Sequence, residues 1–222
     1  MAIYITGDTH GDIDLGKLKK EEFAAQEGDY VIICGDFGAV WDDSKEDKNL
    51  QKWYNSQPWT TLFCDGNHEN FERLSKYPVE EWNGGKVHRI GPKILHLMRG
   101  QVFTIEGKKF FVMGGAQSHD MALRIPGKDW WAEEIPSFRE MDEGLTNLDK
   151  VRYKVDYVIT HSAPTMVLTS INPAYKPDAV TRYLGFVRQI VKFRWHYFGH
   201  YHIDKDFLNY KATCLYNNII EI

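Results

Sequence analysis

Residues 2–11 read Ala-Ile-Tyr-Ile-Thr-Gly-Asp-Thr-His-Gly, and this stretch decides the fold. The apolar and β-branched residues of Ala2–Thr6 predict a short buried strand that ends at Gly7. Asp8 and His10 lie two residues apart, so their side chains point the same way if the segment is extended. A carboxylate and an imidazole at the end of a strand are half of a site for a divalent metal. Taken alone, such a pair is more often a turn with a surface histidine.

Two later segments repeat this arrangement. Tyr30–Cys34 is a continuous apolar run, typical of a fully buried strand, and it leads into Gly35-Asp36. Thr60–Cys64 is a third such run, and it leads into Asp65-Gly66-Asn67-His68-Glu69. Ligands of open α/β sheets bind at the carboxyl ends of the strands. Turn chemistry explains any one of these strand ends, but three in series indicate a metal site.

Two strands predicted in the second half carry histidines in the same relative position. Val155–Thr160 leads directly into His161, and Trp195–Phe198 leads into Gly199-His200-Tyr201-His202. Strand ends thus hold five of the nine histidines, namely His10, His68, His161, His200 and His202. Nitrogen and oxygen ligands without thiolate suit Mn²⁺, Fe or Zn²⁺ rather than a structural zinc site built from cysteines.

Helices and turns are expected between these strands. Charged residues predict helices over Leu15–Glu27 and over residues 42–57, with a short helix after Glu69. Ser137 with Glu140 has the spacing of a capping box, and Asp178 is placed to cap a later helix that runs through about Phe193. Short runs separated by turn residues over Lys86–Met113 predict an antiparallel meander. Gly114–Glu134 is long for a connection, and long loops are often functional.

Composition indicates an ordinary globular chain. The 222 residues are 43% hydrophobic and 26% charged, and one domain over residues 1–222 is expected because no linker or repeat interrupts them. A net charge of −4 does not favour a nucleic-acid binder, so an anionic substrate needs local help, such as metal ions. The three cysteines have no paired spacing, and neither a signal peptide nor a membrane-spanning run is evident. We therefore expect a cytoplasmic protein that does not bind membranes.

The motifs D-x-H, G-D, G-N-H-E, a lone H and G-H-x-H occur here in that order. They begin at Asp8, Gly35, Gly66, His161 and Gly199. Over essentially its whole length, the chain resembles the calcineurin-like metallophosphoesterase superfamily. The resemblance implies an α/β fold, a four-layer α/β/β/α sandwich of two mixed sheets flanked by helices. It also implies a centre of two divalent metal ions, with Mn²⁺ expected first and Fe or Zn²⁺ as alternatives.

The same resemblance implies a role for each motif residue. One metal would be held by Asp8, His10, Asp36 and His202, and the other by Asp36, Asn67, His161 and His200, which makes Asp36 the bridge. His68 would face the phosphoester as a general acid or as a hydrogen-bond donor to the oxyanion. A hydroxide that bridges the two metals would attack phosphorus in line with the leaving oxygen.

The second motif departs from the serine/threonine protein phosphatases of the superfamily. Those enzymes carry G-D-x-x-D-R-G, whereas Ala39 and Val40 stand here in place of the Asp and Arg. The Asp would orient the catalytic histidine and the Arg would hold a phosphate, so His68 is left without an assigned orienting partner. A phosphodiester carries less charge than a monoester, so the missing arginine favours diester or nucleotide substrates.

The leading prediction is a metal-dependent phosphoric ester hydrolase that acts on a small phosphodiester or nucleotide. Alternatives are a phosphomonoesterase like the serine/threonine protein phosphatases and a non-catalytic scaffold, which the complete ligand set disfavours. A nucleic-acid enzyme that uses Arg182, Arg188, Lys192 and Arg194 is possible but not favoured. The sequence does not fix the oligomeric state. Candidate substrate contacts are Asn67, His119, Arg124, Trp130 and Trp131, with packing beneath the loop as the alternative for both tryptophans.

Overall fold

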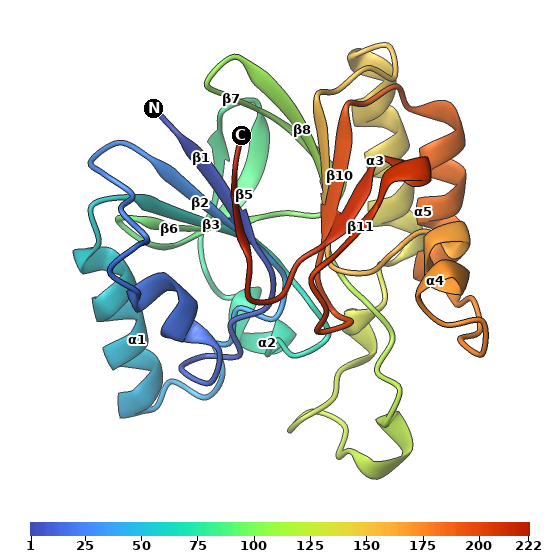
Figure 1. Cartoon of the computed structure of the whole chain (residues 1–222). Coiled ribbons are helices and arrows are strands. Elements are labelled where there is room, and N and C mark those ends of the chain that lie inside the picture. The colour runs from blue at the N-terminus through green and yellow to red at the C-terminus, as the bar shows by residue number, and fades with distance from the viewer.

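The computed structural model describes all 222 residues, and its two β-sheets pack face to face with helices on both outer sides (Figure 1). The first sheet has the strand order β13-β1-β2-β3-β6-β5-β4. Strands β1, β2 and β3 are parallel, so their carboxyl ends meet at one edge. The strands of this sheet are β1 (Ile3–Thr6), β2 (Tyr30–Cys34), β3 (Thr60–Cys64), β4 (Val79–Trp82), β5 (Gly85–Gly91), β6 (Ile94–Leu97) and β13 (Ile219–Glu221).

The second sheet has the order β11-β12-β10-β9-β8-β7. Strands β8, β9 and β10 are parallel, which brings the residues after β9 and β10 to a common edge. The strands are β7 (Gln101–Ile105), β8 (Lys108–Met113), β9 (Tyr157–Thr160), β10 (Trp195–Phe198), β11 (Lys205–Phe207) and β12 (Ala212–Cys214). Both sheets mix parallel and antiparallel pairs, so the predicted α/β/β/α sandwich is confirmed.

The helices cover the two outer faces. Helices α1 (Lys45–Ser56) and α2 (Phe71–Leu74) lie on the side of the first sheet, and α3 (Phe138–Lys150), α4 (Thr165–Ile171) and α5 (Ala179–Ile190) lie on the side of the second (Figure 1). The predicted capping box of Ser137 and Glu140 starts α3, and Asp178 caps α5. No helix has both the length and the apolar character that crossing a membrane requires.

Successive side chains of a strand point to opposite faces of its sheet, so the apolar core is divided into layers. In β2, Ile32 and Cys34 face the second sheet and pack in one cluster with Phe103 and Phe110. The alternate residues Val31 and Ile33 join a second cluster with Tyr54 of α1. A third cluster lies between the second sheet and the helices α3 and α5. Strand β2 is therefore buried on both faces, which explains its continuous apolar run.

The predicted helix over Leu15–Glu27 is wrong. Only a 3₁₀ helix at Leu15–Lys19 forms, and turns and irregular backbone follow it. Lys17 is buried, and its ammonium group donates to the backbone carbonyl oxygens of Gly7 and Asp8 and to that of Tyr216. These bonds tie the segment to the strand ends, and this tertiary requirement overrides the helical propensity of the Lys- and Glu-rich sequence.

The meander predicted over Lys86–Met113 is divided between the two sheets. Strands β5 and β6 pair in the first sheet, whereas β7 and β8 form a hairpin in the second. The turn between β6 and β7 is where the chain crosses from one sheet to the other. Short alternating strands have the same local pattern in either sheet, so the sequence did not reveal this crossing. Strand β4 and helix α4 were not predicted.

Candidate metal centre

The carboxyl ends of strands from both sheets converge at one edge of the sandwich. Asp8 and Asp36 are fully buried there, and His161 has no exposed surface. Three triplets place all their ligand atoms within 4.8 Å of one another: Asp8 with His10 and His202, His10 with Asp36 and His68, and Asp8 with Asp36 and His161. The structure thus brings together six of the eight residues predicted for metal binding and catalysis. The other two, Asn67 and His200, touch this group by the contacts described below.

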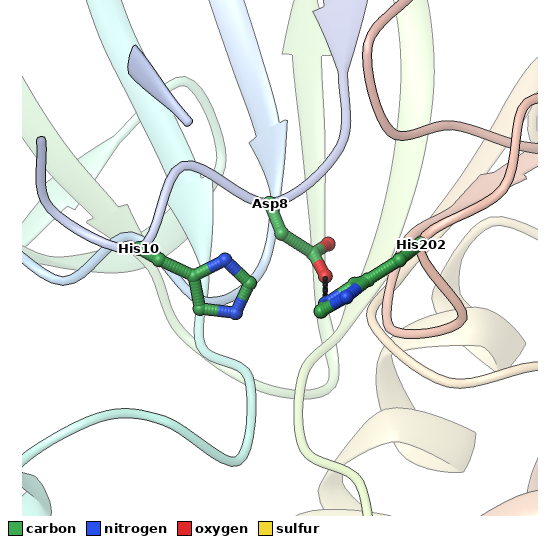
Figure 2. A group of neighbouring side chains, drawn as sticks. All are labelled: Asp8, His10 and His202. Carbon is green, nitrogen blue, oxygen red and sulfur yellow. Dashed lines mark ion pairs between the residues drawn. The ribbon is translucent and has the colours of Figure 1, made fainter. Parts of the chain in front are cut away.

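Asp8, His10 and His202 form the outer part of the group (Figure 2). The Nε2 atom of His202 lies 3.1 Å from Oδ2 of Asp8, and the imidazole ring of His202 stacks on Tyr216. The Nδ1 atom of His10 lies 2.7 Å from Oδ2 of Asp14, which leaves Nε2 facing Asp36 at 3.2 Å. A carboxylate behind a histidine in this way fixes the ring and its tautomer, as in many metal sites.

Asp36 and His161 form the inner part. The Nδ1 atom of His161 lies 2.7 Å from the carbonyl oxygen of Cys34, so Nδ1 carries the proton and donates it. The Nε2 atom then faces Oδ2 of Asp36 at 3.3 Å and Oδ1 of Asn67 at 3.1 Å. The other oxygen of Asp36 accepts the backbone N–H of His68 at 2.7 Å. Oδ2 of Asp36 therefore stands between the imidazoles of His10 and His161.

His200 lies beside this inner part. Its backbone N–H donates to Oδ1 of Asp8 at 3.0 Å, and its ring centroid is 4.9 Å from that of His161. Asn67 donates its amide N–H to Oγ of Ser118 at 3.2 Å, and this bond turns the amide oxygen toward His161.

The glycine of each motif makes room for a side chain of another motif. A Cβ atom on Gly35 would lie 2.1 Å from Nδ1 of His161, and one on Gly199 would lie 2.1 Å from Oδ1 of Asp8. Real Cβ atoms do not approach other atoms so closely, so both contacts require glycine. The strand ends interlock through these positions, which explains why a glycine precedes Asp36 and His200 in the sequence.

The backbone of the centre is strained. His10, Asp36, His200 and His202 all have positive φ values, between 43° and 69°. Such conformations cost about 1–3 kcal/mol each for residues other than glycine, and they are concentrated at functional sites. The buried hydrogen bonds around Asp8 and Asp36 hold these four residues in place.

The charges of the centre favour ion pairs between its buried groups. Burial lowers the pKa of His161, but the adjacent Asp36 carboxylate raises it more, to about 10. Burial likewise lowers the pKa of His10, but the hydrogen bond to Asp36 raises it more, to about 9. Burial alone would raise the pKa of Asp36. The positive charge of His161 has the larger opposite effect, so the pKa of Asp36 lies well below its usual range.

His68 has an unexpected neighbour. Its Nδ1 atom lies 3.3 Å from Nη1 of Arg124, in the loop between β8 and α3. Arginine can only donate, so Nδ1 accepts and the proton of a neutral His68 sits on Nε2. Burial lowers the pKa of His68, and the positive charge of Arg124 contributes to this lowering. Arg124 thus lies where an orienting partner of His68 would stand.

The long loop carries four of the five predicted substrate contacts, and these four side chains differ in how far they are buried. This loop projects from the lower edge of the sandwich (Figure 1). Trp131 is buried with 7% of its surface exposed and packs edge-on against Trp41, so it offers no ring face to a substrate. Trp130 is half-buried and donates its indole N–H to Glu134 at 2.8 Å. The packing alternative therefore describes Trp131, whereas Trp130 keeps part of its surface open.

His119 is exposed, and its ring centroid lies 5.5 Å from that of His200. It is thus beside the centre, as its prediction as a substrate contact requires. Two of the four basic residues considered for nucleic-acid binding have partners within the protein. Arg194 pairs with Asp156, and Arg188 is partly buried over Phe193.

Several residues of the site gave no signal in the sequence. Asp14 holds His10, Ser118 holds Asn67, and Glu134 accepts from both the backbone and the hydroxyl group of Ser118. Ordinary polar residues such as these acquire their role only from the fold.

Comparison with known proteins agrees with this geometry. A family model described as calcineurin-like phosphoesterase matches residues 1–204. The chain therefore belongs to the calcineurin-like phosphoesterase family.

Among solved structures, a chain from Staphylococcus aureus named as a 5′-nucleotidase, in complex with alpha-ketoglutarate, is similar in fold. The identity is 16% and the TM-score 0.50, over 99% of this chain and 50% of the other. This chain thus spans about half the length of that protein. No curated protein matches the sequence.

Proposed function

We propose that the chain is a dinuclear metal-dependent phosphoesterase that hydrolyses phosphodiester or nucleotide-type bonds. The observation that carries the proposal is the position of Asp36. Its buried carboxylate lies between the ligand nitrogens of His10 and His161, at 3.2 and 3.3 Å, where one oxygen can serve two metal ions. Two-metal sites hold their ions about 3.5–4 Å apart, a separation that one bridging carboxylate can span.

The donor set fits two divalent ions. Asp8, His10, Asp36 and His202 would hold the first ion, and Asp36, Asn67, His161 and His200 the second. The buried Asp8 and Asp36 supply two negative charges, and the remaining ligands are neutral nitrogen or oxygen donors when bound to metal. This set contains no thiolate, which favours Mn²⁺, with Fe or Zn²⁺ as alternatives. When bound, two such ions lower the pKa of water and stabilise charge on phosphoryl oxygens.

His68 would act on the substrate through Nε2–H. Arg124 occupies Nδ1, which leaves Nε2–H free to act on a substrate, and the ring lies in one triplet with His10 and Asp36. A positioned N–H donor stabilises negative charge as it develops on a phosphoryl or leaving oxygen. The contact with Arg124 favours this hydrogen-bond role over full proton transfer, because a neighbouring positive charge opposes protonation of Nδ1.

Arg124 would orient His68 rather than hold the substrate phosphate. Its Nε and Nη2 atoms donate to Asp120 at 2.7 and 2.8 Å, and Nη1 also donates to the carbonyl oxygen of Asp129. Four of its five N–H groups are therefore engaged, and Asp120 neutralises its charge. Arg124 therefore does not replace the arginine that protein phosphatases use for a monoester, which supports the preference for a diester.

Substitution of Arg124 tests this role. Arg124→Ala is expected to lower kcat for bis(p-nitrophenyl) phosphate about tenfold with little change in KM, because one oriented hydrogen bond is lost. Arg124→Lys should not rescue the rate, since an ammonium group cannot contact Asp120, Asp129 and His68 in one plane. A rise in KM at constant kcat would show instead that Arg124 binds the substrate. Arg139→Ala, on the exposed surface of α3, is the matched control for charge.

The pH dependence of stability tests the metal ligands. His10 and His161 have pKa values raised above their ordinary 6.5, so their stabilising effect in metal-depleted protein is complete below about pH 6.5 and lost as pH rises toward 9 and 10. Between about pH 6.5 and 8, each should lower the free energy of unfolding by about 1.4 kcal/mol per pH unit. Metal-loaded protein should lack this fall, because its ligand imidazoles are already neutral.

The measurement is urea unfolding of chelator-treated and Mn²⁺-loaded protein at several pH values in this range. Comparison of the two samples removes the contributions of groups that titrate alike in both. Identical pH dependence with and without Mn²⁺ would contradict the assignment of His10 and His161 as ligands.

Two alternatives can be separated from the proposal by simple assays. A phosphomonoesterase would hydrolyse p-nitrophenyl phosphate faster than the diester bis(p-nitrophenyl) phosphate. A scaffold of the same fold would hydrolyse neither with any divalent metal. We expect metal-dependent turnover with the diester preferred.

A further inference from the structure

A cavity opens beside the proposed metal centre. It has a volume of about 550 Å³, within the usual range for small-molecule sites. One wall is formed by Gln117, Ser118 and His119 of the loop after β8, and the other by residues 174–179 and Arg182 at the start of α5. The two walls come from segments far apart in the sequence, and His119 is the only one of these residues predicted from the sequence to contact a substrate.

Two residues of this cavity touch residues proposed as metal ligands. Oγ of Ser118 accepts the amide N–H of Asn67 at 3.2 Å. The ring of His119 lies against His200, with centroids 5.5 Å apart. The cavity therefore lies next to two residues proposed as metal ligands, and a substrate held at the metal centre can extend toward it.

Aromatic rings line the way into the cavity. His119 stacks on Tyr175 with a centroid distance of 5.6 Å and an interplanar angle of 23°. Tyr175 in turn stacks on Tyr201 at 6.1 Å and 28°. Tyr175 is half-buried, so part of its ring remains open to the cavity. Because these rings already stack on one another, only the open part of the Tyr175 ring can accept a flat heterocycle. Stacking there requires no particular base.

Positive charge lies on the wall beyond the rings. Lys176 and Arg182 both line the cavity and are exposed, and neither forms an ion pair or a side-chain hydrogen bond within the protein. The one carboxylate among the lining residues is that of Asp178, whose Oδ1 accepts the backbone N–H of Thr181 at the start of α5. The two cations are thus available to an anionic group of a ligand.

We propose that this cavity is a nucleoside subsite for substrates that carry a second phosphate. The base would stack on the open part of the Tyr175 ring, beside His119, and the second phosphate would face Lys176 and Arg182, while the scissile phosphoester lies at the metal centre. The preferred substrates are then nucleoside phosphodiesters that carry a further phosphate, such as short phosphorylated dinucleotides, rather than simple diesters. This inference rests on the proposed function and narrows its substrate class.

Three chromogenic diesters that release the same p-nitrophenolate test the subsite. They are bis(p-nitrophenyl) phosphate, thymidine 5′-(p-nitrophenyl phosphate), and the latter with an added 3′-phosphate. With Mn²⁺, kcat/KM should rise along this series by roughly tenfold for the nucleoside, the range expected for one stacked base. A further rise of about fivefold or more is expected for the 3′-phosphate, and it should shrink at high salt.

Substitutions show which residues produce each increase in kcat/KM. Tyr175→Ala should remove the gain from the nucleoside, and Tyr175→Phe should retain it because the ring remains. The double variant Lys176→Ala/Arg182→Ala should remove only the gain from the 3′-phosphate. Lys192→Ala, an exposed lysine outside this cavity, is the control for net charge.

The possible outcomes separate the subsite from the proposed function. Equal kcat/KM for the three diesters in the wild type would overturn the subsite and leave the phosphoesterase assignment standing. An equal loss on all three diesters in Tyr175→Ala would also overturn it, because the residue would then be merely structural. Failure of the wild type to hydrolyse any of them with metal would overturn the proposed function itself.

Discussion

Asp36→Asn is expected to lower kcat/KM for bis(p-nitrophenyl) phosphate by at least about a thousandfold, since catalytic metal ions contribute several kcal/mol to stabilisation of the transition state. The substitution is close to isosteric. The side-chain oxygen of asparagine can still accept the backbone N–H of His68, as Oδ1 of Asp36 does at 2.7 Å. The amide nitrogen, however, would replace the oxygen that lies between His10 and His161, and an amide nitrogen does not ligate a metal.

Metal content shows whether the loss arises at the bridge. Elemental analysis of Asp36→Asn should find about one Mn²⁺ or fewer per chain, against about two in the wild type. Asp29→Asn is the matched control, because Asp29 is also a buried carboxylate, but it accepts from the backbone of Ala2 and Gln26. It should lose stability and keep both metal ions. Two ions and near-normal turnover in Asp36→Asn would contradict the bridging role.

His68→Ala is the second substitution with a large expected effect. We expect kcat to fall about a hundredfold to a thousandfold, as when one donor to an oxyanion is removed. Metal content should stay at the wild-type value, because His68 is proposed to act on the substrate although its ring lies in one triplet with His10 and Asp36. Loss of a metal ion in this variant would show that His68 is a ligand.

The identity of the leaving group distinguishes the two roles of His68. A hydrogen-bond donor to a phosphoryl oxygen should matter equally for aryl and alkyl esters. A general acid should matter more for alkyl esters, because an alkoxide needs a proton far more than p-nitrophenolate does. We expect His68→Ala to lower the rate by similar factors for both types of diester. A much larger loss on the alkyl diester would assign proton transfer to His68.

The sequence predicted the strand ends of the centre well, and the reason is physical. Parallel strands such as β1, β2 and β3 must bring their carboxyl ends to one edge, so Asp8, Asp36 and Asn67 had to lie near one another. Apolar runs buried on both faces made these strands easy to recognise. The interlocking glycines Gly35 and Gly199 belong to the same local motifs.

Features that depend on tertiary contacts were not predictable in this way. The contact between Arg124 and His68 joins residues 56 positions apart and depends on the course of a long loop. The burial of Trp131 against Trp41 depends on the same loop. The failed helix over Leu15–Glu27 is similar, since the ammonium group of Lys17 binds carbonyl oxygens that only the folded chain brings together. In each case long-range geometry overrides a local pattern.

The most direct test of the central claim is a titration of metal-depleted protein with Mn²⁺, followed by hydrolysis of bis(p-nitrophenyl) phosphate at each step. A dinuclear centre bridged by Asp36 predicts that activity reaches its maximum at about two equivalents of Mn²⁺ per chain and is low at one. Full activity at one equivalent, or turnover that is independent of added metal, would contradict the account.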